Sequence, residues 1–354
     1  MATQRELAKL AGVSAGTVSN VISGSTRVSE SSRRKVLAAI ESLHYRPNLI
    51  ARSLKTNRTN TLGIVVPDIT IPFFPKIVRG AESAARERGY FLVVLDSQGS
   101  HELEVDMMTL LRQRVDGILL VTAGAYKWSE QSVAEIYSGP PVVCVDRLPE
   151  GFESDSVCVD NFGAAELGVK HLISQGHKDI AILTGPLTLT NEQERLRGYR
   201  QALKEAGIRV RPARIWSAGF EVREIEAVCR RRMRSVRERP SALFATNGVA
   251  GIGALRGMYE LGLSIPNDIA FATIDELITE DLFRPRITSV VQPTFEIGYR
   301  AVEVLLDRIR SAGGTANGSP TGSSTTSKVR LGATLVIRES SLKLKRKSRR
   351  STER

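Results

Sequence analysis

The chain has 354 residues, 42% of them hydrophobic, and carries a formal net charge of +12. No run approaches the roughly 18 apolar residues that a membrane-spanning helix needs, which argues against a helical membrane protein. The three cysteines are far apart and form no CxxC pair, which excludes a disulfide framework and a zinc site of usual spacing. The first ten residues, MATQRELAKL, lack the apolar core of a signal peptide, so a cytoplasmic protein is expected.

The positive charge is concentrated at the two ends of the chain. Residues 1–60 contain ten Lys and Arg against three Glu, and residues 343–354 contain seven Lys and Arg against one Glu. Residues 61–342 are close to neutral. A basic end beside a neutral body is typical of a protein whose end segment contacts nucleic acid. For the basic tail, residues 343–354, a disordered solubilising segment is an equally good interpretation.

Capping signals predict three short helices at the N-terminus. A T-x-x-E capping box that begins at Thr3 predicts a first helix, and Gly12 is a natural C-cap for it. Ser14 and Ser29 are candidate N-caps for the second and third helices. Three helices with matching apolar faces and a tight turn between the first two are typical of a helix-turn-helix DNA-binding domain, which we assign to residues 1–46.

A short helical segment follows this domain. Pro47 fits the first turn of a helix that continues through the sequence LIARSLK. A helix of about seven or eight residues does not persist alone in water, so it needs a partner to form. The sequence NRTN then predicts a linker, and we assign residues 47–60 to a hinge helix and linker.

From Leu62 onwards the hydrophobic pattern changes. Short β-branched runs, among them LGIVV, FLVVL, GILLV and PVVCV, alternate with helical stretches, and the series restarts after Asn161. This alternation predicts parallel sheets covered by helices, and two consecutive series predict two similar lobes within residues 61–342. Ligands in such folds bind at the carboxyl ends of the strands. The Gly/Ser/Thr-rich residues 311–325 predict a flexible loop, and the sequence KVRLGATLVIRE after it predicts a strand.

Several sequence motifs occur in a characteristic order. LAKLAGVSAGTVSNVIS is a helix-turn-helix signature, and YRPNLIARSLK follows it as a hinge-helix sequence. Further along the chain come PFF, GP, RLRG, ATN and then Asp275. From about Thr3 to Ser341 the chain thereby resembles the LacI/GalR family of bacterial transcription regulators. The resemblance implies an N-terminal helix-turn-helix domain and a two-lobed, periplasmic-binding-protein-like domain that binds an effector and dimerises.

The resemblance implies a homodimer that binds a pseudo-palindromic operator in double-stranded DNA. The second helix of each head would enter the major groove, and the hinge helices would lie in the minor groove between the half-sites. By resemblance, Leu54 wedges into the central base step and Lys55 contacts the groove; the alternative for Leu54 is a packing contact with the effector domain. The DNA-contacting positions carried over by resemblance are Ser14, Ala15, Gly16, Thr17, Ser19, Asn20, Asn48, Ala51, Leu54 and Lys55.

Two of the positions that read bases in the family carry almost no side chain here. Ala15 can contact a thymine methyl group and Gly16 permits close backbone approach, but neither side chain donates a hydrogen bond. Asn20, a third specificity position, can pair with adenine. We therefore expect specificity to depend on Asn20 and on the deformability of the DNA at the hinge site.

By resemblance, the effector binds between the two lobes. Carboxylates, amides and a guanidinium around aromatic faces suit a polyhydroxylated small molecule. A sugar or sugar acid is the leading interpretation, and a purine-type corepressor is the alternative. The effector-binding residues carried over by resemblance are Phe73, Phe74, Asp146, Asp160, Arg195, Phe220, Asn247, Asp275 and Gln292.

Each effector-site assignment has a structural alternative. Asp146 or Asp160 can merely cap a helix, and a phenylalanine of the set can merely fill the core. Two positions also depart from the family pattern, which often has Asn before the PFF motif and Asp after Asn247. This chain has Ile71 and Gly248 at these positions. The loss of two polar groups leaves the identity of the effector open.

We therefore expect a sequence-specific DNA-binding transcriptional regulator, a repressor whose operator affinity a small molecule controls. No catalytic residue, metal site or cofactor is expected, because the sequence has no nucleophile or metal-ligand set at a characteristic spacing. An alternative is a solute-binding protein for uptake, which uses the same two-lobed architecture. The basic helical head argues against it. The arginine-rich stretch RRRMR, residues 230–234, with Arg237 and Arg239, is expected to be the solvated face of a helix.

Overall fold

The computed structural model describes residues 3–22, 25–45, 58–124, 128–149, 151–277, 282, 284–313 and 326–342. The chain separates into two compact units, residues 1–59 and residues 60–354. The hinge positions Asn48, Ala51, Leu54 and Lys55, most of the loop predicted over residues 311–325, and the basic tail lie outside the described residues. Among the residues that are described, no helix has the length and apolar character needed to cross a membrane.

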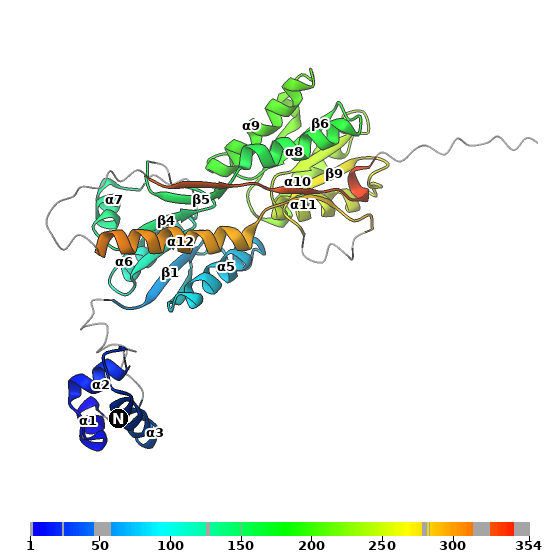
Figure 1. Cartoon of the computed structure of the whole chain (residues 1–354). Coiled ribbons are helices and arrows are strands. Elements are labelled where there is room, and N and C mark those ends of the chain that lie inside the picture. Colours follow the sequence, from blue (N-terminus) through cyan, green and yellow to red (C-terminus); the bar gives the residue numbers. More distant parts are fainter. Residues whose placement is uncertain are drawn as a thin grey trace, which may run out of the picture. The chain divides into compact units, whose positions relative to one another are not determined.

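The described residues of the N-terminal unit form three helices, which are labelled in Figure 1: α1 (Gln4–Ala11), α2 (Ala15–Ile22) and α3 (Glu30–Ser42). Both halves of the predicted capping box are present, since the Glu6 amide donates to Thr3 Oγ1 and the Thr3 amide donates to the Glu6 carboxylate. Gly12 ends α1 at φ +64°, a left-handed conformation that glycine adopts without strain. The first helix therefore begins and ends where local chemistry predicts.

One small core holds the three helices together. Leu7 of α1, Val18 of α2 and Val36 of α3 are fully buried against one another's helices. These side chains recur on the inner face of each helix, which leaves the opposite face of α2 open to solvent. The tight turn at Gly12 and this shared core together form the helix-turn-helix arrangement.

The larger unit contains two lobes, each built on a six-stranded sheet covered by helices (Figure 1). The strand order is β11-β5-β4-β3-β1-β2 in the first sheet and β12-β10-β9-β8-β6-β7 in the second. Of the pairings between described strands, only that of β10 with β12 is antiparallel. The predicted pair of parallel α/β lobes is therefore confirmed.

The elements of the larger unit alternate along the chain. The strands are β1 (Thr61–Val66), β2 (Phe91–Asp96), β3 (Gly117–Leu120), β4 (Val142–Val145), β5 (Asp155–Val159), β6 (Ile180–Thr184), β7 (Ile215–Ser217), β8 (Ala242–Ala245), β9 (Ala270–Ile274), β10 (Thr288–Val291), β11 (Lys328–Leu331) and β12 (Thr334–Val336). The helices are α5 (Phe73–Glu87), α6 (His101–Arg112), α7 (Glu130–Tyr137), α8 (Asn161–Ser174), α9 (Thr190–Glu205), α10 (Val222–Met233), α11 (Gly248–Glu260) and α12 (Thr294–Gly313), with 3-10 turns η1 (Pro212–Arg214) and η3 (Glu339–Ser341).

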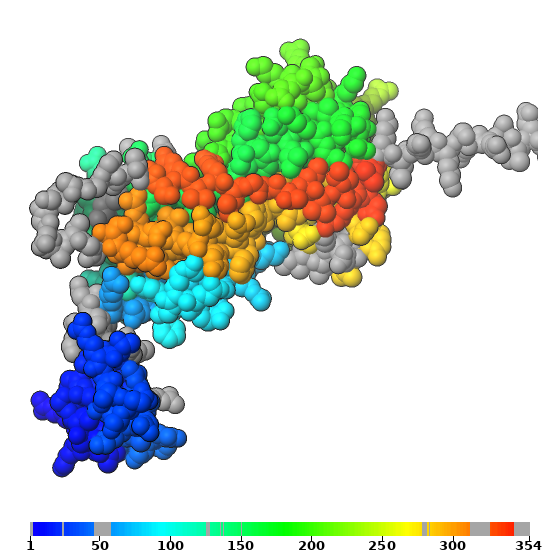
Figure 2. Space-filling model, in the orientation of Figure 1, coloured from blue at the N-terminus to red at the C-terminus, as the bar shows by residue number. Residues whose placement is uncertain are grey.

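Three connections pass from one lobe to the other: β5 to α8, β10 to α12, and β11 to β12. Helix α8 packs on strands of the second sheet, whereas α12 packs back on β3, β4 and β5 of the first sheet. In Figure 2 the last of these segments, coloured red-orange, runs along both lobes at the surface. Because three short segments join the lobes, the lobes can open and close about them while each sheet stays intact.

The structure corrects the predicted strand pattern at the places where the chain changes lobe. The sequence KVRLGATLVIRE, predicted as one strand, is divided at Gly332: β11 pairs with β5 in the first sheet, and β12 pairs with β10 in the second. Strand β10, which also precedes a crossing, was not predicted, because its short buried sequence TSVV shows no clear alternation of apolar and polar residues.

Helices α5 and α12 cross at two glycines. A Cβ atom added at Gly80 would lie 2.0 Å from the backbone oxygen of Phe295, and one added at Gly298 would lie 2.0 Å from that of Ile77. No side chain fits at either position, so the two backbones are in direct contact. Both helices begin beside the cavity described below, and the close contact fixes their relative position.

Candidate effector cavity and DNA-binding surface

The exposed face of α2 carries the residues predicted to contact DNA. Ser14, Ala15, Gly16 and Asn20 are exposed, whereas Val18 on the opposite face is buried in the core of the head. Apart from its chain neighbours and the backbone of α2, a Cβ placed at Gly16 would have one described atom within 4 Å, Ser14 Oγ at 3.6 Å. The middle of this face is thus flat, and a bound duplex can approach the backbone closely.

The hydroxyl groups at the start of α2 are already engaged with the helix. Ser14 Oγ accepts from the backbone amide of Thr17 at 3.0 Å and lies 2.9 Å from Thr17 Oγ1. Ser14 is therefore the N-cap of α2 as well as a predicted phosphate contact. Thr17 and Ser19 are half-buried. The assignment of these residues to DNA contact stays a prediction.

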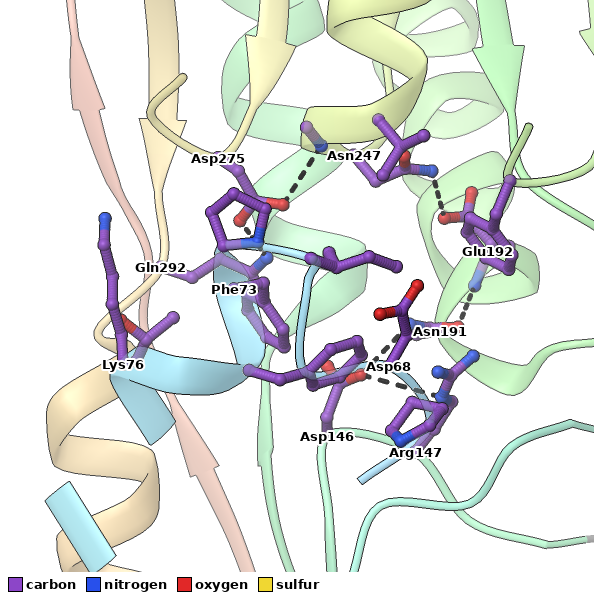
Figure 3. A pocket seen from close by; sticks show the side chains of 18 of the residues that line it. Asp68, Phe73, Lys76, Asp146, Arg147, Asn191, Glu192, Asn247, Asp275 and Gln292 are labelled. Atoms are coloured by element: carbon purple, nitrogen blue, oxygen red, sulfur yellow. Dashed lines mark hydrogen bonds and ion pairs between the residues drawn. The ribbon is translucent and has the colours of Figure 1, made fainter. Parts of the chain in front are cut away.

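A cavity of about 310 Å³ lies between the two lobes, where strands of both sheets end. Eight of the nine predicted effector residues line it: Phe73, Phe74, Asp146, Arg195, Phe220, Asn247, Asp275 and Gln292. Ile71 and Gly248, the two departures from the family pattern, line it as well. Figure 3 shows several of these side chains around the cavity, from elements of both lobes.

Asp160 does not line the cavity, which corrects its predicted role. Its carboxylate accepts from the Gly163 amide at 2.9 Å and caps α8. Asp146 and Asp160 both follow strands, but their backbones differ. Asp146 has φ +67°, so the chain turns sharply there and Asp146 lines the cavity; Asp160 has φ −68° and leads directly into a helix.

Asp275 is fixed by two hydrogen bonds at the rim of the second lobe. Gln292 Nε2 donates to Asp275 Oδ1 at 2.6 Å, and the Gly248 amide donates to Asp275 Oδ2 at 3.2 Å (Figure 3). Asp275 also has positive φ, +72°, at the end of β9. Left-handed backbone at a non-glycine residue costs free energy and is concentrated at functional sites. Burial raises the pKa of this carboxyl, because it removes the charged form from water.

Arg195 of α9 is held by acceptors from several elements. Its Nε donates to Asn161 Oδ1 at 2.8 Å, and Nη1 donates to the Thr246 carbonyl at 2.8 Å and to Glu192 Oε1 at 3.2 Å. Its Nη2 donates to Gln292 Oε1 at 3.4 Å. A guanidinium has five N–H groups, so one on Nη2 is left for a ligand. The side chain is buried and pre-oriented before any ligand arrives.

Asp146 and Arg147 form the opposite wall, on the first lobe. Both are buried, and Arg147 Nε lies 3.9 Å from Asp146 Oδ2. Asp146 Oδ1 and Arg147 Nε have no hydrogen-bond partner among the described residues. The Arg147 guanidinium lies over the Phe74 ring, 5.9 Å from its centroid. Burial raises the pKa of the Asp146 carboxyl and lowers the pKa of the Arg147 guanidinium, because both groups are cut off from water.

Several lining residues were not predicted from the sequence. Glu192 accepts from Asn247 Nδ2 at 3.0 Å and from the Gly185 amide at 3.1 Å, and thereby connects α9, α11 and the end of β6. Asn191 Nδ2 lies 3.5 Å from Asp146 Oδ2, across the two lobes. A signal was present, since Asn191 and Glu192 lie in the first turn of α9, on the turn before Arg195. Asp68 and Lys76 of the first lobe also line the cavity (Figure 3).

Two aromatic rings at the start of α5 form part of the wall. Phe73 and Phe74 lie edge to face, with ring centroids 5.3 Å apart and an interplanar angle of 82°. Phe220 reaches the cavity from the second lobe and is 37% exposed. Apolar faces beside buried hydrogen-bonding groups suit a small molecule with both apolar C–H and polar O–H surfaces.

Two family models match the chain. Residues 3–48 match the lacI family of bacterial regulatory proteins, and residues 169–341 match a periplasmic binding protein-like domain. The ribose operon repressor of Escherichia coli is 37% identical over 311 residues, which cover 87% of this chain and 93% of that protein. The HTH-type transcriptional repressor PurR of Vibrio vulnificus is 34% identical over 311 residues, which cover 88% of this chain and 92% of that protein.

Solved structures agree in fold over almost the whole chain. The lac repressor dimer bound to operator and the anti-inducer ONPF has a TM-score of 0.80 at 26% identity, covering 97% of this chain and 99% of that chain. The complex of the transcriptional regulator CelR with cellobiose has a TM-score of 0.70 at 31% identity, covering 96% of this chain and 100% of that chain. With a helix-turn-helix head, a two-lobed effector domain and these relatives, the chain belongs to the lacI family of bacterial regulatory proteins, DNA-binding transcriptional regulators that respond to small molecules.

Proposed function

We propose that the protein is a cytoplasmic repressor that binds its operator as a homodimer and releases it when a neutral monosaccharide occupies the cavity between the lobes. The observation that carries the choice of ligand is a pair of buried polar atoms without partners, on two residues that line the cavity. Asp146 Oδ1 is an acceptor and Arg147 Nε is a donor, and neither has a hydrogen-bond partner among the described residues.

Sugar hydroxyls match this pair. A buried polar group without a partner costs roughly 1–3 kcal/mol, so a ligand that pairs with it recovers that free energy. A hydroxyl donates to one group and accepts from another, and neighbouring hydroxyls on a sugar ring supply both functions at once. Arg147 Nε lies 3.9 Å from the Asp146 carboxylate, so two adjacent hydroxyl groups suit them.

The charges around the cavity favour a neutral ligand over a sugar acid. Its lining contains six carboxylate side chains and three cations: Asp68, Asp146, Glu192, Glu221, Asp275 and Glu276 against Lys76, Arg147 and Arg195. An anionic ligand would meet an excess of negative charge in a partly buried site, where repulsion is poorly screened. A neutral polyol avoids this repulsion and uses the carboxylates as hydroxyl acceptors.

The shape of the cavity favours a monosaccharide over a purine. Its volume of about 310 Å³ is at the small end of the range for ligand sites. A planar base gains most from parallel aromatic faces on both sides, whereas Phe73 and Phe74 are nearly perpendicular. The likeness to the ribose operon repressor makes a pentose the first sugar to test.

The DNA contacts follow the assignments made from the sequence. The exposed face of α2 would enter the major groove, with Asn20 as the base-reading side chain and Ala15 and Gly16 in close contact with the groove floor. Neither of these two small residues has a side chain that can donate a hydrogen bond to a base. Specificity therefore depends on few direct contacts and on the DNA deformation that the hinge residues Leu54 and Lys55 would produce.

A second copy would cover an exposed apolar surface of the first lobe. Edge strand β2 leaves Phe91, Val93 and Val94 exposed by 67%, 40% and 39%. Exposed apolar side chains on an edge strand are a liability unless another chain covers them. Ligand closure of the lobes would shift this surface in each protomer, and thereby change the separation of the two DNA-binding heads. A coupling of about 1–3 kcal/mol suffices for a 5–150-fold change in operator affinity.

A binding screen on the full-length protein tests the ligand. We expect a neutral pentose or hexose to raise the unfolding temperature and to bind with one site per chain, whereas the matching sugar acids and nucleobases do not. At 100 times its dissociation constant the ligand stabilises the fold by about 2.7 kcal/mol. Stabilisation by a nucleobase and by no sugar would refute the sugar assignment.

A gel-shift titration on a palindromic operator tests the regulation. We expect salt-dependent binding of one dimer per operator and a weakening of at least fivefold on addition of the sugar. Strengthening on addition of the sugar would show a corepressor instead of an inducer. Failure to bind duplex DNA at any salt concentration would reject the repressor assignment.

A further inference from the structure

A second cavity, of about 500 Å³, lies on the second lobe and shares no lining residue with the effector cavity. Its wall comes from three segments: η1 with the adjoining β7, the last turn of α10, and the residues just beyond α10. Five of its eight lining residues are arginines. The lining residues are Arg211, Ala213, Arg214, Trp216, Arg231, Arg232, Arg237 and Glu238.

Two of these arginines share one carboxylate. Arg214 Nε donates to Asp179 Oδ1 and Nη2 donates to Asp179 Oδ2, both at 2.6 Å. Its Nη1 donates at 2.6 Å to the Glu238 carbonyl. Arg211 donates to the same carboxylate. Only 12% of the Arg214 side chain is exposed. One carboxylate therefore serves two guanidiniums, and the group keeps a net positive charge.

The other three arginines have no such partner. Arg231, Arg232 and Arg237 are exposed and make no hydrogen bond or ion pair within the described part of the chain. Arg230, a neighbour on the same helix, does have a partner, since it forms an ion pair with Glu260 at 2.7 Å. The sequence predicts one solvated face for this whole stretch, but the fold directs part of it to a concave surface.

The balance of charge in this cavity is opposite to that of the effector cavity. Its described lining contains five guanidiniums and one carboxylate, that of Glu238, while Asp179 binds Arg211 and Arg214 from outside the lining. Like charges gathered in a hollow repel one another, and their repulsion falls when an anion binds between them. Guanidinium groups present planar pairs of N–H donors that match phosphate oxygens in a bidentate geometry.

We propose that this cavity binds a phosphorylated small molecule, with Arg231, Arg232 and Arg237 as phosphate ligands and the Arg211–Arg214 pair as an additional source of positive charge. A small ligand is favoured over an acidic protein or nucleic acid, because the arginines of three chain segments line one hollow instead of an extended surface. This site goes beyond the proposed sugar response. Helix α10 connects the two sites, since it begins after Phe220 and Glu221 of the effector cavity and ends at the arginine cavity.

Titration calorimetry on the full-length protein, at a fixed ionic strength of about 0.15 M, tests the site. The probes are inorganic phosphate, inorganic pyrophosphate and fructose 1,6-bisphosphate, so that free phosphate and an organic phosphate are compared directly. The cavity variant is Arg231→Gln/Arg232→Gln/Arg237→Gln. The matched control is Arg209→Gln/Arg223→Gln/Arg234→Gln, which removes the same charge from exposed arginines outside the cavity.

We expect pyrophosphate or the bisphosphate to bind the wild type with one site per chain. The cavity variant should weaken binding at least tenfold and the control variant less than twofold, with sugar binding and the unfolding temperature unchanged in both. Equal weakening of phosphate binding in both variants would mean that net charge alone causes the loss, which would overturn the proposal. So would the absence of wild-type binding at about 1 mM probe, or tighter binding of a polyglutamate peptide than of any phosphate probe, which would assign the cavity to an acidic protein.

Discussion

The Gln292 side-chain amide donates a 2.6 Å hydrogen bond to the Asp275 carboxylate, and its oxygen accepts from Arg195 at 3.4 Å. Gln292 lies at the crossing from β10 to α12, while Asp275 ends β9 in the second lobe. A segment that joins the two lobes is thus hydrogen-bonded to two charged groups of the effector cavity. Any ligand that changes the hydrogen bonds of Asp275 or Arg195 acts directly on this crossing.

Replacement of Asp275 should therefore damage the response to effector. In Asp275→Asn, the donors from Gln292 and Gly248 both lose the carboxylate acceptor, and one of them meets an NH2 group in place of an oxygen. A hydrogen bond to a charged group contributes about 1.5–3 kcal/mol, so sugar affinity should fall roughly 10–100-fold. Calorimetry measures the loss, and gel shift should show unchanged operator binding without sugar.

Asp160→Asn is the matched control for this change. Asp160 only caps α8, and asparagine caps a helix as well as aspartate does. Sugar affinity and stability should both stay close to those of the wild type. A larger loss of sugar affinity in Asp160→Asn than in Asp275→Asn would contradict the assignment of the cavity.

Two glycines of the head should respond in opposite directions to replacement by alanine. Gly12 has φ +64°, so Gly12→Ala forces a side chain into the left-handed region at a cost of about 1 kcal/mol. Gly16 lies within α2 with open space around it, so Gly16→Ala should stabilise the head by up to about 1 kcal/mol. Native-state hydrogen exchange of the amides of α1 to α3 in the full-length chain measures both changes.

The same two variants distinguish an effect on the stability of the head from an effect on its contact with DNA. Gly16→Ala should weaken operator binding although it stabilises the head, because the added methyl group lies on the surface predicted to meet the groove. Gly12→Ala should weaken binding to operator DNA and to non-specific DNA by the same factor, which is set by the fraction of heads that are unfolded. Tighter operator binding by Gly16→Ala would show that this surface does not face DNA.

Glu104 should make stability depend on pH in the direction opposite to most carboxylates. It is fully buried, accepts from Thr122 Oγ1 at 3.0 Å and from the Ala123 amide, and burial raises its pKa from 4.5 to about 7. Between these pH values the folded state binds a proton that the unfolded state has lost, so stability falls as pH rises. The loss reaches about 3 kcal/mol by pH 7 and then levels off.

The variant Glu104→Gln isolates this contribution, because glutamine resembles the protonated carboxyl. Denaturant unfolding from about pH 4.5 to pH 8 should show the stability of the wild type falling relative to that of the variant. A constant difference across this range would mean that Glu104 does not change its protonation on unfolding. Ala123 lines the effector cavity, so sugar affinity should be measured over the same range.

The contact between α5 and α12 should not tolerate a methyl group. In Gly298→Ala the new Cβ would lie 2.0 Å from the Ile77 backbone oxygen, so the two helices must separate. Overpacking of this kind costs typically 1–3 kcal/mol, and a backbone obstacle places the expected loss at the upper end. Gly332→Ala is the control, since no atom lies within 4 Å of its Cβ position. Equal unfolding free energies for the two variants, measured in urea, would contradict the contact.

The helices of the head could be predicted because their signals are local. The capping box at Thr3, the C-cap at Gly12 and the cap at Ser29 each involve residues within about one turn of one another. The parallel lobes could likewise be predicted from the alternation of apolar strands and helices. Recognition of the family, which rests on residue types at fixed spacing, then indicated eight of the residues that line the effector cavity.

Other features depend on contacts between distant residues. The division of the last predicted strand at Gly332 is set by pairing with β5 on one side and β10 on the other. Arg147 was not predicted, because nothing in its neighbourhood distinguishes it from an ordinary surface charge, and Glu192 was missed although it lies one turn before Arg195. Their importance follows from burial, which requires partners from other elements.

The sequence by itself determined the helix-turn-helix head, the two α/β lobes and the family, since local caps, hydrophobic periodicity and residue spacing encode them. Only the tertiary structure decided that Asp146 lines the effector cavity while Asp160 caps a helix, and that arginines of α10 form a cavity of their own. The physical reason is that a charged group acquires its role from its solvation and from the groups that face it. Both are set by elements that are distant along the chain.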